Sequence, residues 1–333
     1  MKEVGLGLVG LGYIGKTHLR HCLKLESARL VAVSDVSKRA LNFARKMGVK
    51  KTFRDYQQLL KDDQIDAVIV ALPTYLHVPC ANEAADAGKD IFLEKPLARN
   101  AVEGREITSK ARKCGAKLMV GYPFRFLPSF RNLKQEISTG ALGEVQTAYA
   151  SLIGSGPFLY RAETHVPHPV PSWWLEKESA GGGSLLDQGC HLINLLRWFL
   201  GEVADAKCKL GYRFNLDVED HAMCMMKFRS GQTAVANVGW YSMKDQIKVE
   251  LLGSVRHAVA HYRSSNKIIS ALKLLAGITP RFDIPYLREL QHFVHCVKED
   301  ISPSPSGDDA LRDLELISSA YKNQISLGNS TIT

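Results

Sequence analysis

Short apolar runs alternate with longer amphipathic segments in the first third of the chain. The runs that we expect to form strands span residues 4–9, 30–34, 67–71, 91–93 and 117–120. Between them, apolar positions recur at helical spacing in residues 14–25, 37–47, 56–61, 78–87 and 101–113. Alternating strands and helices form a parallel sheet covered on both faces, because each crossover helix packs back onto the sheet. The pattern predicts a doubly wound α/β Rossmann domain over residues 1–122.

The pattern changes after Gly121. Helices are expected at residues 130–138, 186–200, 285–297 and 308–324, and strands at residues 144–153, 204–214, 221–228, 233–240 and 247–252. Consecutive strands without intervening helices are typical of an antiparallel sheet. We therefore expect residues 123–333 to form an α+β domain with a large, open, mostly antiparallel sheet, which binds substrate and mediates oligomerisation.

The composition is that of a globular enzyme. The chain has 333 residues, of which 45% are hydrophobic and 23% charged, so two domains are expected. The apolar stretch at residues 65–72 is far shorter than the roughly 20 residues that a membrane helix needs, so no membrane association is predicted. The N-terminal sequence lacks the pattern of a secretory leader, and we expect a cytoplasmic protein.

Cysteines and charge indicate no further chemistry. The seven cysteines are scattered without a C-x-x-C pair, so we expect reduced core residues and neither a disulfide framework nor a metal site. The formal net charge is +9, but Lys and Arg are spread along the chain without a dense cluster. Spread charge without a recognition motif does not predict nucleic-acid binding.

A glycine-rich turn follows the first strand. Gly10, Gly12 and Gly15 match G-x-G-x-x-G between a strand and a helix, where the motif allows a tight turn, close approach of a pyrophosphate and helix–strand packing. Asp35 ends the second strand, 20 residues after Gly15, where a carboxylate binds the adenine ribose hydroxyls. The alternative is a structural turn beside a solvated acid. The pair of matches predicts a dinucleotide site.

Asp35 also bears on the choice of cofactor. A carboxylate at this place repels the 2′-phosphate of NADP, so NAD is favoured. Lys38 and Arg39 lie nearby and offer charge for a phosphate, which keeps NADP open as the less favoured cofactor.

Three residues suit hydride transfer from a secondary alcohol. Lys95 follows the strand at residues 91–93, at the end of a parallel sheet where ligands bind. Asp187 and His191 are expected on one face of a single helix at i and i+4. A neutral histidine accepts a hydroxyl proton well, and an ammonium group stabilises a developing alkoxide. The alternatives are a surface lysine, a first-turn acid and a buried core histidine.

These motifs resemble the Gfo/Idh/MocA oxidoreductases, a family that includes glucose-fructose oxidoreductase and inositol dehydrogenase. The resemblance extends over most of the chain and rests on residues 10–15, 71–77, 94–97, 121–126 and 181–191. It implies a Rossmann domain followed by an α+β domain whose open sheet forms a subunit interface, giving a homodimer or homotetramer. It also implies Lys95, Asp187 and His191 as the catalytic set.

The resemblance extends the expected sites. The expected cofactor contacts are Gly10, Gly12, Tyr13, Ile14, Gly15, Asp35, Arg39, Leu72, Pro73, Thr74, His77, Glu94 and Lys95. The expected substrate contacts are Lys95, Tyr122, Arg125, Trp174, Asp187 and His191. No metal ligands are predicted.

An aromatic and basic loop precedes the glycine run at residues 181–183. It holds Tyr160, Arg161, His165, His168, Trp173 and Trp174, which suit either a sugar or nucleotide pocket or a packed interface. We expect an NAD-dependent dehydrogenase of a ring hydroxyl on a sugar, a cyclitol or a UDP-linked amino sugar. Two alternatives stay open: a glycosidase that retains NAD, and a dinucleotide-sensing regulator without catalysis.

Overall fold

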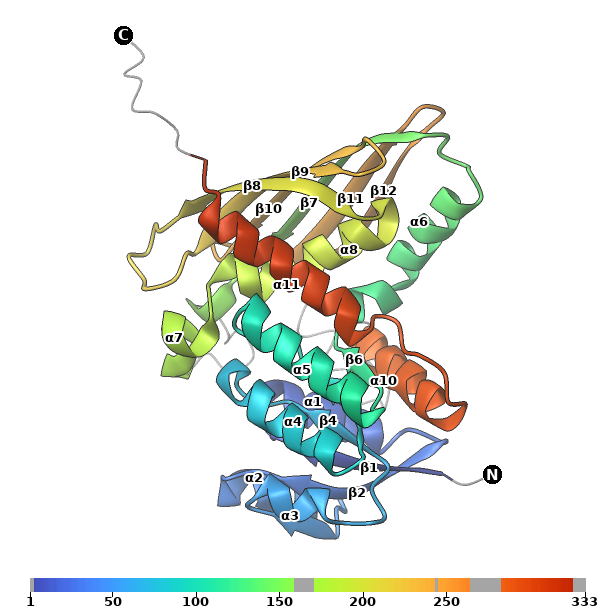
Figure 1. Cartoon of the computed structure of the whole chain (residues 1–333), viewed down its shortest axis with the longest axis vertical. Coiled ribbons are helices and arrows are strands. Elements are labelled where there is room, and N and C mark those ends of the chain that lie inside the picture. Colours follow the sequence, from blue (N-terminus) through green and yellow to red (C-terminus); the bar gives the residue numbers. More distant parts are fainter. Residues whose placement is uncertain (1–2, 159–170, 243–244, 264–282, 326–333) are drawn as a thin grey trace. The chain divides into compact units, whose positions relative to one another are not determined.

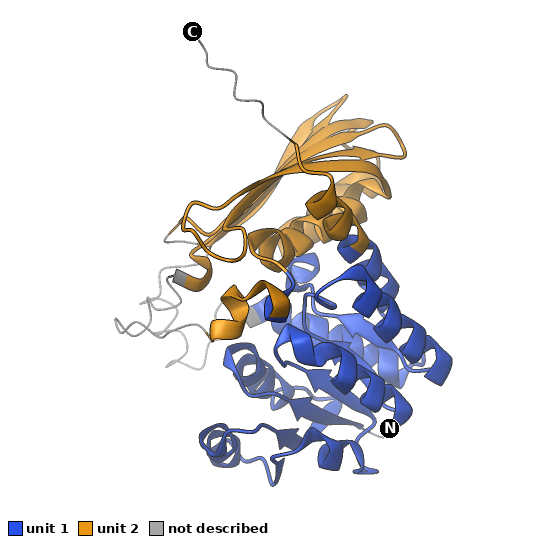
Figure 2. Ribbon diagram, turned by 60° about the vertical axis from the view of Figure 1, so that its left-hand side comes forward, with its two compact units in different colours: residues 1–127, 179–181, 265–314 blue, residues 128–178, 182–264, 315–333 orange. Residues whose placement is uncertain are grey.

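The structure is a computed structural model that describes residues 3–158, 171–242, 245–263 and 283–325. Its chain divides into two compact units, which Figure 2 shows in separate colours. Unit 1 comprises residues 1–127, 179–181 and 265–314, and unit 2 comprises residues 128–178, 182–264 and 315–333. Tyr160, Arg161, His165 and His168 of the aromatic loop lie outside the described residues.

Unit 1 contains a parallel sheet of six strands with the order β3-β2-β1-β4-β5-β6. The strands are β1 (Val4–Val9), β2 (Ala28–Ser34), β3 (Lys51–Phe53), β4 (Ala67–Val70), β5 (Asp90–Leu93) and β6 (Leu118–Val120). The strand order reverses between β1 and β4, the place where ligands bind in sheets of this type. The predicted Rossmann fold is confirmed, and β3 is a further strand that its short, half-exposed sequence did not reveal.

Helices connect these strands and cover the sheet (Figure 1). They are α1 (Tyr13–Cys22), α2 (Lys38–Lys46), α3 (Tyr56–Leu60), the 3₁₀ turn η1 (Thr74–Leu76), α4 (His77–Asp86), α5 (Ala101–Cys114) and the 3₁₀ turn η2 (Pro123–Phe126). Asn100 shows why α5 begins where it does, because its side chain accepts hydrogen bonds from the amides of Val102 and Glu103. The helix ends at Gly115, which adopts the left-handed conformation with φ +70°.

A later helix completes the core of unit 1. Helix α10 (Asp283–Lys298) packs against α1 and η2. Its buried residues Leu290, Phe293 and Val294 join the apolar cluster that includes Leu6 and Leu19. A segment that begins 163 residues after the last strand of the parallel sheet therefore helps to stabilise it.

Unit 2 contains a second sheet of six strands with the order β12-β11-β7-β10-β9-β8. The strands are β7 (Val145–Ile153), β8 (Val203–Gly211), β9 (His221–Phe228), β10 (Thr233–Gly239), β11 (Gln246–Gly253) and β12 (His257–Arg263). Neighbouring strands are antiparallel except β7 and β10, which pair in parallel. The predicted mostly antiparallel sheet is confirmed, with β12 as a strand that the sequence pattern did not indicate.

The helical elements of unit 2 and the chain end complete the structure. They are α6 (Pro128–Ser138), the 3₁₀ turns η3 (Gly156–Phe158) and η4 (Ser172–Leu175), α7 (Lys177–Ala180), the π-helical turn η5 (Leu185–Gly189), α8 (Cys190–Leu200) and α11 (Gly307–Lys322). Helix α8 packs against β7 and β10, and α6 packs against β12. No helix of the described residues is both long and apolar enough to span a bilayer.

The expectation that all cysteines are reduced core residues is wrong in two respects. Cys208 and Cys224 are opposite each other on β8 and β9 and form a disulfide. A spacing of 16 residues gave no sign of this, because only the register of the two strands brings the thiols together. Cys114 is exposed at the end of α5, whereas Cys22, Cys80, Cys190 and Cys296 are buried as expected.

Candidate active site

The glycine-rich turn is shaped by close backbone contacts. Gly10 has φ +92°, and a methyl group on it would lie 2.4 Å from the carbonyl oxygen of Ala71. A methyl group on Gly15 would lie 2.1 Å from the carbonyl oxygen of Gly10. Both positions require glycine for folding.

Gly12 differs from its two neighbours in the motif. A methyl group there would meet no atom of the described residues within 4 Å. Gly12 is the N-cap of α1 and provides no side-chain cap, and the first turn of α1 carries no acidic residue. Helix amides without a capping side chain bind anions, and the helix dipole adds to the attraction. The turn therefore fits a dinucleotide pyrophosphate at Gly12, while Tyr13 and Ile14 begin the helix beside it.

Asp35 holds the turn in place. One carboxylate oxygen accepts a 2.7 Å hydrogen bond from the Leu11 amide, and the other accepts one of 2.7 Å from the Ser37 amide. Arg39 is exposed in the first turn of α2. A cation at a helix N-terminus opposes the helix dipole, so Arg39 is better suited to an external anion than to stabilising α2.

His77 links two loops that follow neighbouring strands. Its Nε2 atom lies 3.0 Å from the Leu72 carbonyl oxygen, and its Nδ1 atom lies 3.0 Å from the Pro96 carbonyl oxygen. Burial lowers the pKa of His77, so the neutral ring donates to one of the two carbonyls at a time. Thr74 is buried, and Leu72 and Pro73 are half-buried at this edge of the sheet. Because β4 and β5 are paired, the structure brings both predicted loops together.

Lys95 lies in the turn that directly follows β5. Glu94 is buried, and its Oε2 atom accepts a 3.2 Å hydrogen bond from the Lys95 amide. The Oε1 atom of Glu94 lies 2.6 Å from Nε2 of His18 in α1. The backbone of Lys95 is thus tied through one carboxylate to the helix that begins at the glycine turn.

Tyr122 directly precedes η2, and Arg125 lies within η2. Both are buried, with exposed fractions of 2% and 7%. Arg125 Nη1 lies 3.5 Å from the Ser304 hydroxyl, so this guanidinium has a partner within unit 1. Their role as substrate contacts stays a prediction.

Asp187 and His191 belong to unit 2, and a single regular helix does not carry them. Asp187 lies in the π-helical turn η5, and His191 lies in the first turn of α8. The π-helical turn runs directly into α8, and the expectation that the two side chains share one face of the helix stays a prediction. Such turns are rare and often occur at functional sites. Asp187 is half-buried and His191 is 8% exposed.

Glu219, which precedes β9, anchors this segment. Its carboxylate accepts hydrogen bonds from the amides of Gly183 at 3.0 Å and Leu185 at 2.9 Å, and from the Tyr321 hydroxyl at 2.8 Å. Burial raises the pKa of Glu219, although these hydrogen bonds act in the opposite direction. Neither Glu219 nor Tyr321 was predicted, because no motif or spacing connects residues so far apart in the chain.

Trp174 packs against another indole in unit 2. The ring centroids of Trp174 and Trp240 are 6.4 Å apart in an edge-to-face arrangement. Trp240 is almost fully buried, whereas Trp174 is half-buried and keeps exposed surface. The Trp174 indole therefore has a packing partner within unit 2.

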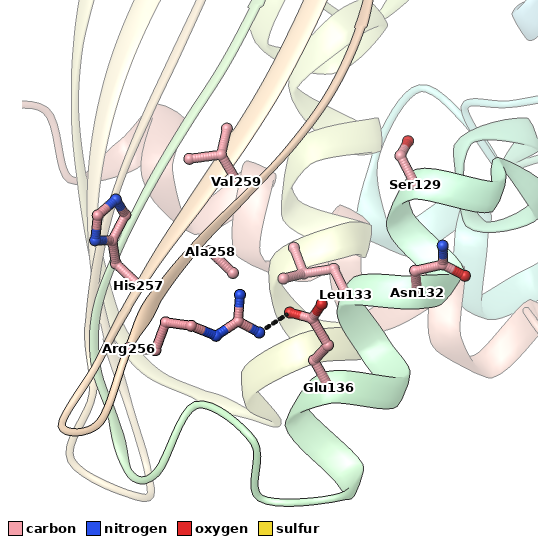
Figure 3. A pocket seen from close by; sticks show the side chains of 8 residues that line it. All are labelled: Ser129, Asn132, Leu133, Glu136, Arg256, His257, Ala258 and Val259. Atoms are coloured by element: carbon pink, nitrogen blue, oxygen red, sulfur yellow. Dashed lines mark hydrogen bonds and ion pairs between the residues drawn. The ribbon is translucent and has the colours of Figure 1, made fainter.

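A separate cavity of about 350 Å³ lies between α6 and β12 (Figure 3). Its lining residues are Ser129, Asn132, Leu133, Glu136, Arg256, His257, Ala258 and Val259. Arg256 and Glu136 pair at 2.8 Å across it. None of the predicted site residues lines this cavity.

Family models match both parts of the chain. An oxidoreductase family model with an NAD-binding Rossmann fold matches residues 4–122, and the GFO/IDH/MocA C-terminal domain matches residues 130–259. The chain belongs to the GFO/IDH/MocA oxidoreductase family. The predicted family is thereby confirmed.

Individual relatives agree over nearly the full length. The chain is 28% identical to myo-inositol 2-dehydrogenase of Thermotoga maritima, with 96% of this chain and 95% of the relative covered. It is also 28% identical to scyllo-inositol 2-dehydrogenase (NAD(+)) of Bacillus subtilis, with 94% and 92% covered. Among solved structures, GenD2 from gentamicin A biosynthesis in complex with NAD has a TM-score of 0.83 at 23% identity, with 97% and 94% covered. This last likeness supports the fold.

Proposed function

We propose that this protein is an NAD-dependent dehydrogenase that oxidises a ring hydroxyl of a cyclitol, a sugar or a UDP-linked amino sugar. The open space at Gly12 before an uncapped helix carries the proposal, because it fits a pyrophosphate and is not needed by the fold. Curated relatives over nearly the whole chain are inositol dehydrogenases, which favours a polyhydroxylated ring as substrate.

NAD is the proposed cofactor, in preference to NADP. Asp35 is held by the Leu11 and Ser37 amides at the end of β2, where a carboxylate binds ribose hydroxyls and repels a 2′-phosphate. The relative from Bacillus subtilis carries NAD(+) in its name. Arg39 is the residue that would favour NADP.

Lys95, Asp187 and His191 are the proposed catalytic residues. When bound, NAD supplies the acceptor for the hydride that leaves the carbinol carbon. His191 takes the hydroxyl proton, for which a neutral imidazole is suited at physiological pH. The Lys95 ammonium stabilises the developing charge on the substrate oxygen. Asp187 accepts a hydrogen bond from a neighbouring hydroxyl and so orients the ring.

Further residues are proposed to contact the nicotinamide and the substrate. Leu72, Pro73, Thr74 and His77 are proposed to border the nicotinamide, as are Glu94 and Lys95. Tyr122, Arg125 and Trp174 are proposed as substrate contacts, and a half-buried indole such as Trp174 suits stacking on a sugar ring.

We further propose a homo-oligomer formed through the outer face of the second sheet. Met225, Val235, Tyr149, Glu250 and Val259 are opposite one another in successive strands and point away from the buried face. Met225, Tyr149 and Val259 are 45–50% exposed. A row on an open sheet that is apolar apart from Glu250 favours pairing with a second copy.

Net formation of NADH tests the reaction. The purified protein is incubated with NAD and a panel of inositols, free sugars and UDP-linked sugars, and the oxidised product is identified by mass spectrometry. The proposal predicts one NADH for each carbonyl product. Cleavage of glycosidic bonds without net NADH would instead indicate a glycosidase. Tight NAD binding without reduction by any compound would indicate a regulator.

A further inference from the structure

Three titratable side chains meet in the interior of unit 1. His18 comes from α1, Glu94 follows β5, and Glu289 comes from α10; both helices are labelled in Figure 1. His18 and Glu289 are fully buried, and Glu94 is 6% exposed. Their ligand-type atoms all lie within 4.8 Å of one another. Interiors rarely contain such groups unless the charges are compensated.

Compensation is incomplete for Glu289. Neither of its carboxylate oxygens has a hydrogen-bond partner within the described part of the chain. The His18 ring of this cluster meets Phe92 and Tyr286 edge-to-face, with centroid distances of 5.4 and 6.1 Å. An ionised carboxylate at such a place has lost its water without gaining a donor.

Among residues 3–158, 171–242, 245–263 and 283–325, no charged neighbour is recorded as stabilising the Glu289 carboxylate. Helix α1 presents His18, with His21 one turn further on, and the strand side presents Glu94. On α10 itself, Arg288 directs Nη1 to the Phe126 carbonyl oxygen, and His292 contacts Cys296 and the Ser304 amide. Burial, with repulsion from Glu94, raises the pKa of Glu289 well above its usual value.

A divalent cation is the rival explanation for such a group. Two ligands on one tetrahedral zinc ion lie roughly 3.4 Å apart at ordinary Zn–N and Zn–O lengths. Nε2 of His18 and Oε1 of Glu94 are only 2.6 Å apart, which is a direct hydrogen bond. This distance favours a shared proton over a shared metal ion.

We propose that His18, Glu94 and Glu289 form a buried proton-sharing triad, in which Glu289 is the neutral acid and Glu94 the carboxylate. Two carboxyl groups at this separation without a cation retain one proton between them. The two carboxyl groups of the triad thus carry a single negative charge, on Glu94, where two ionised carboxylates would carry two. The ligand-type atoms of the three side chains all lie within 4.8 Å of one another, a distance short enough for one bridging water to span.

The triad also positions Lys95. Glu94 accepts from His18 with one oxygen and from the Lys95 amide with the other, so it connects α1 to the Lys95 turn. Helix α1 begins at Gly12, the end proposed to bind the pyrophosphate. We infer that Glu94, His18 and Glu289 are positioning residues. The positioning role rests on the proposed function of Lys95. The proposed protonation state of Glu289 is independent of that function.

Unfolding at different pH values tests the protonation state. A folded-state pKa above the unfolded value contributes stability that is full below the unfolded pKa and is lost as pH rises through the folded pKa. The unfolding constant of the wild type should therefore rise relative to that of Glu289→Gln, by up to about tenfold per pH unit above the usual Glu value. Glu299→Gln, at an exposed position just after α10, should follow the wild type.

The experiment uses urea unfolding of the full chain between pH 5 and 8. Parallel curves for the wild type and Glu289→Gln would overturn the proposal, as would stabilisation of the wild type but not of Glu289→Gln by one equivalent of Zn²⁺. If Glu289→Gln does not fold, Glu289→Met replaces it. Should neither fold, infrared spectroscopy of the wild type decides. A protonated carboxylic acid at pH 7.5 supports the proposal, and its absence overturns it.

Kinetics test the positioning role separately. Glu94→Gln keeps the shape of the side chain and removes its charge. It should lower kcat about tenfold, a larger factor than its effect on the Kd for NAD, to which Glu94 contributes as a proposed neighbour of the nicotinamide. If Glu94 had a purely structural role, the substitution would lower stability and leave the kcat of the folded variant unchanged. That result would overturn the proposed positioning of Lys95. If the wild type turned over none of the tested compounds, the proposed function would be refuted, and the unfolding result for Glu289 would still stand.

Discussion

Two alanine substitutions in the glycine-rich turn should affect different properties, one the stability of the fold and the other the binding of NAD. Gly15→Ala places a methyl group 2.1 Å from the carbonyl oxygen of Gly10, well inside van der Waals contact. Gly12→Ala places one where the described residues leave more than 4 Å of space. The first change disturbs the fold, and the second occupies only the space proposed for the pyrophosphate.

The magnitudes follow from these contacts. Crowding of a well-packed site costs about 1–3 kcal/mol, which we expect for Gly15→Ala. Gly12 has extended backbone angles of φ −64° and ψ −158°, so alanine at this N-cap should cost less than about 1 kcal/mol. A methyl group in the path of the pyrophosphate should weaken NAD binding at least about tenfold, equivalent to about 1.4 kcal/mol.

Urea unfolding and calorimetric titration with NAD measure the two effects on the same preparations. We expect Gly12→Ala to unfold close to the wild type and to bind NAD weakly, and Gly15→Ala to unfold at lower urea. The reasoning is refuted if Gly12→Ala binds NAD as the wild type does, or if it loses as much stability as Gly15→Ala.

Three further variants test other parts of the site. Tyr321→Phe removes the 2.8 Å hydrogen bond to buried Glu219 and should lower the free energy of unfolding by about 1.5–3 kcal/mol, measured in urea. The control Tyr212→Phe, at an exposed position after β8, should change it by less than about 0.5 kcal/mol. Equal losses in the two variants would contradict the role of Glu219 as an anchor. Asp35→Asn keeps an acceptor for the Leu11 amide but removes the charge, so NADP should gain about tenfold on NAD in kcat/KM; an unchanged ratio would exclude the proposed repulsion. Met225→Lys adds a cation beside Lys207 on the neighbouring strand and should reduce the mass found by light scattering, whereas an unchanged mass argues against the outer-face interface.

Local chemistry explains what the sequence predicted well. Gly10 and Gly15 follow directly from the tight strand-to-helix turn, and the alternating apolar runs identify the parallel sheet because period and length differ between strands and helices. Short elements were missed because they contain too few residues to show a hydrophobic period. Strand β3 has three residues and none of them is buried, so it shows no apolar period.

Long-range contacts explain what the sequence could not predict. The apolar face of α10 indicates that the helix packs, but not that it packs on α1. Glu219 and Tyr321 meet only in the folded chain, as do His18, Glu94 and Glu289. The π-helical turn at Asp187 was read as part of a regular helix because its hydrophobic pattern fits either form.

The central claim is that Lys95 and His191 catalyse the oxidation of a ring hydroxyl, in which the carbinol carbon gives its hydride to NAD. The most direct measurement is single-turnover formation of NADH with an accepted substrate and saturating NAD, in the wild type, Lys95→Ala and His191→Ala. Lys113→Ala and His257→Ala serve as exposed controls. We predict that the first two variants lose turnover by about a hundredfold or more while their Kd for NAD stays within about threefold of the wild type. Full activity in both variants would contradict the assignment.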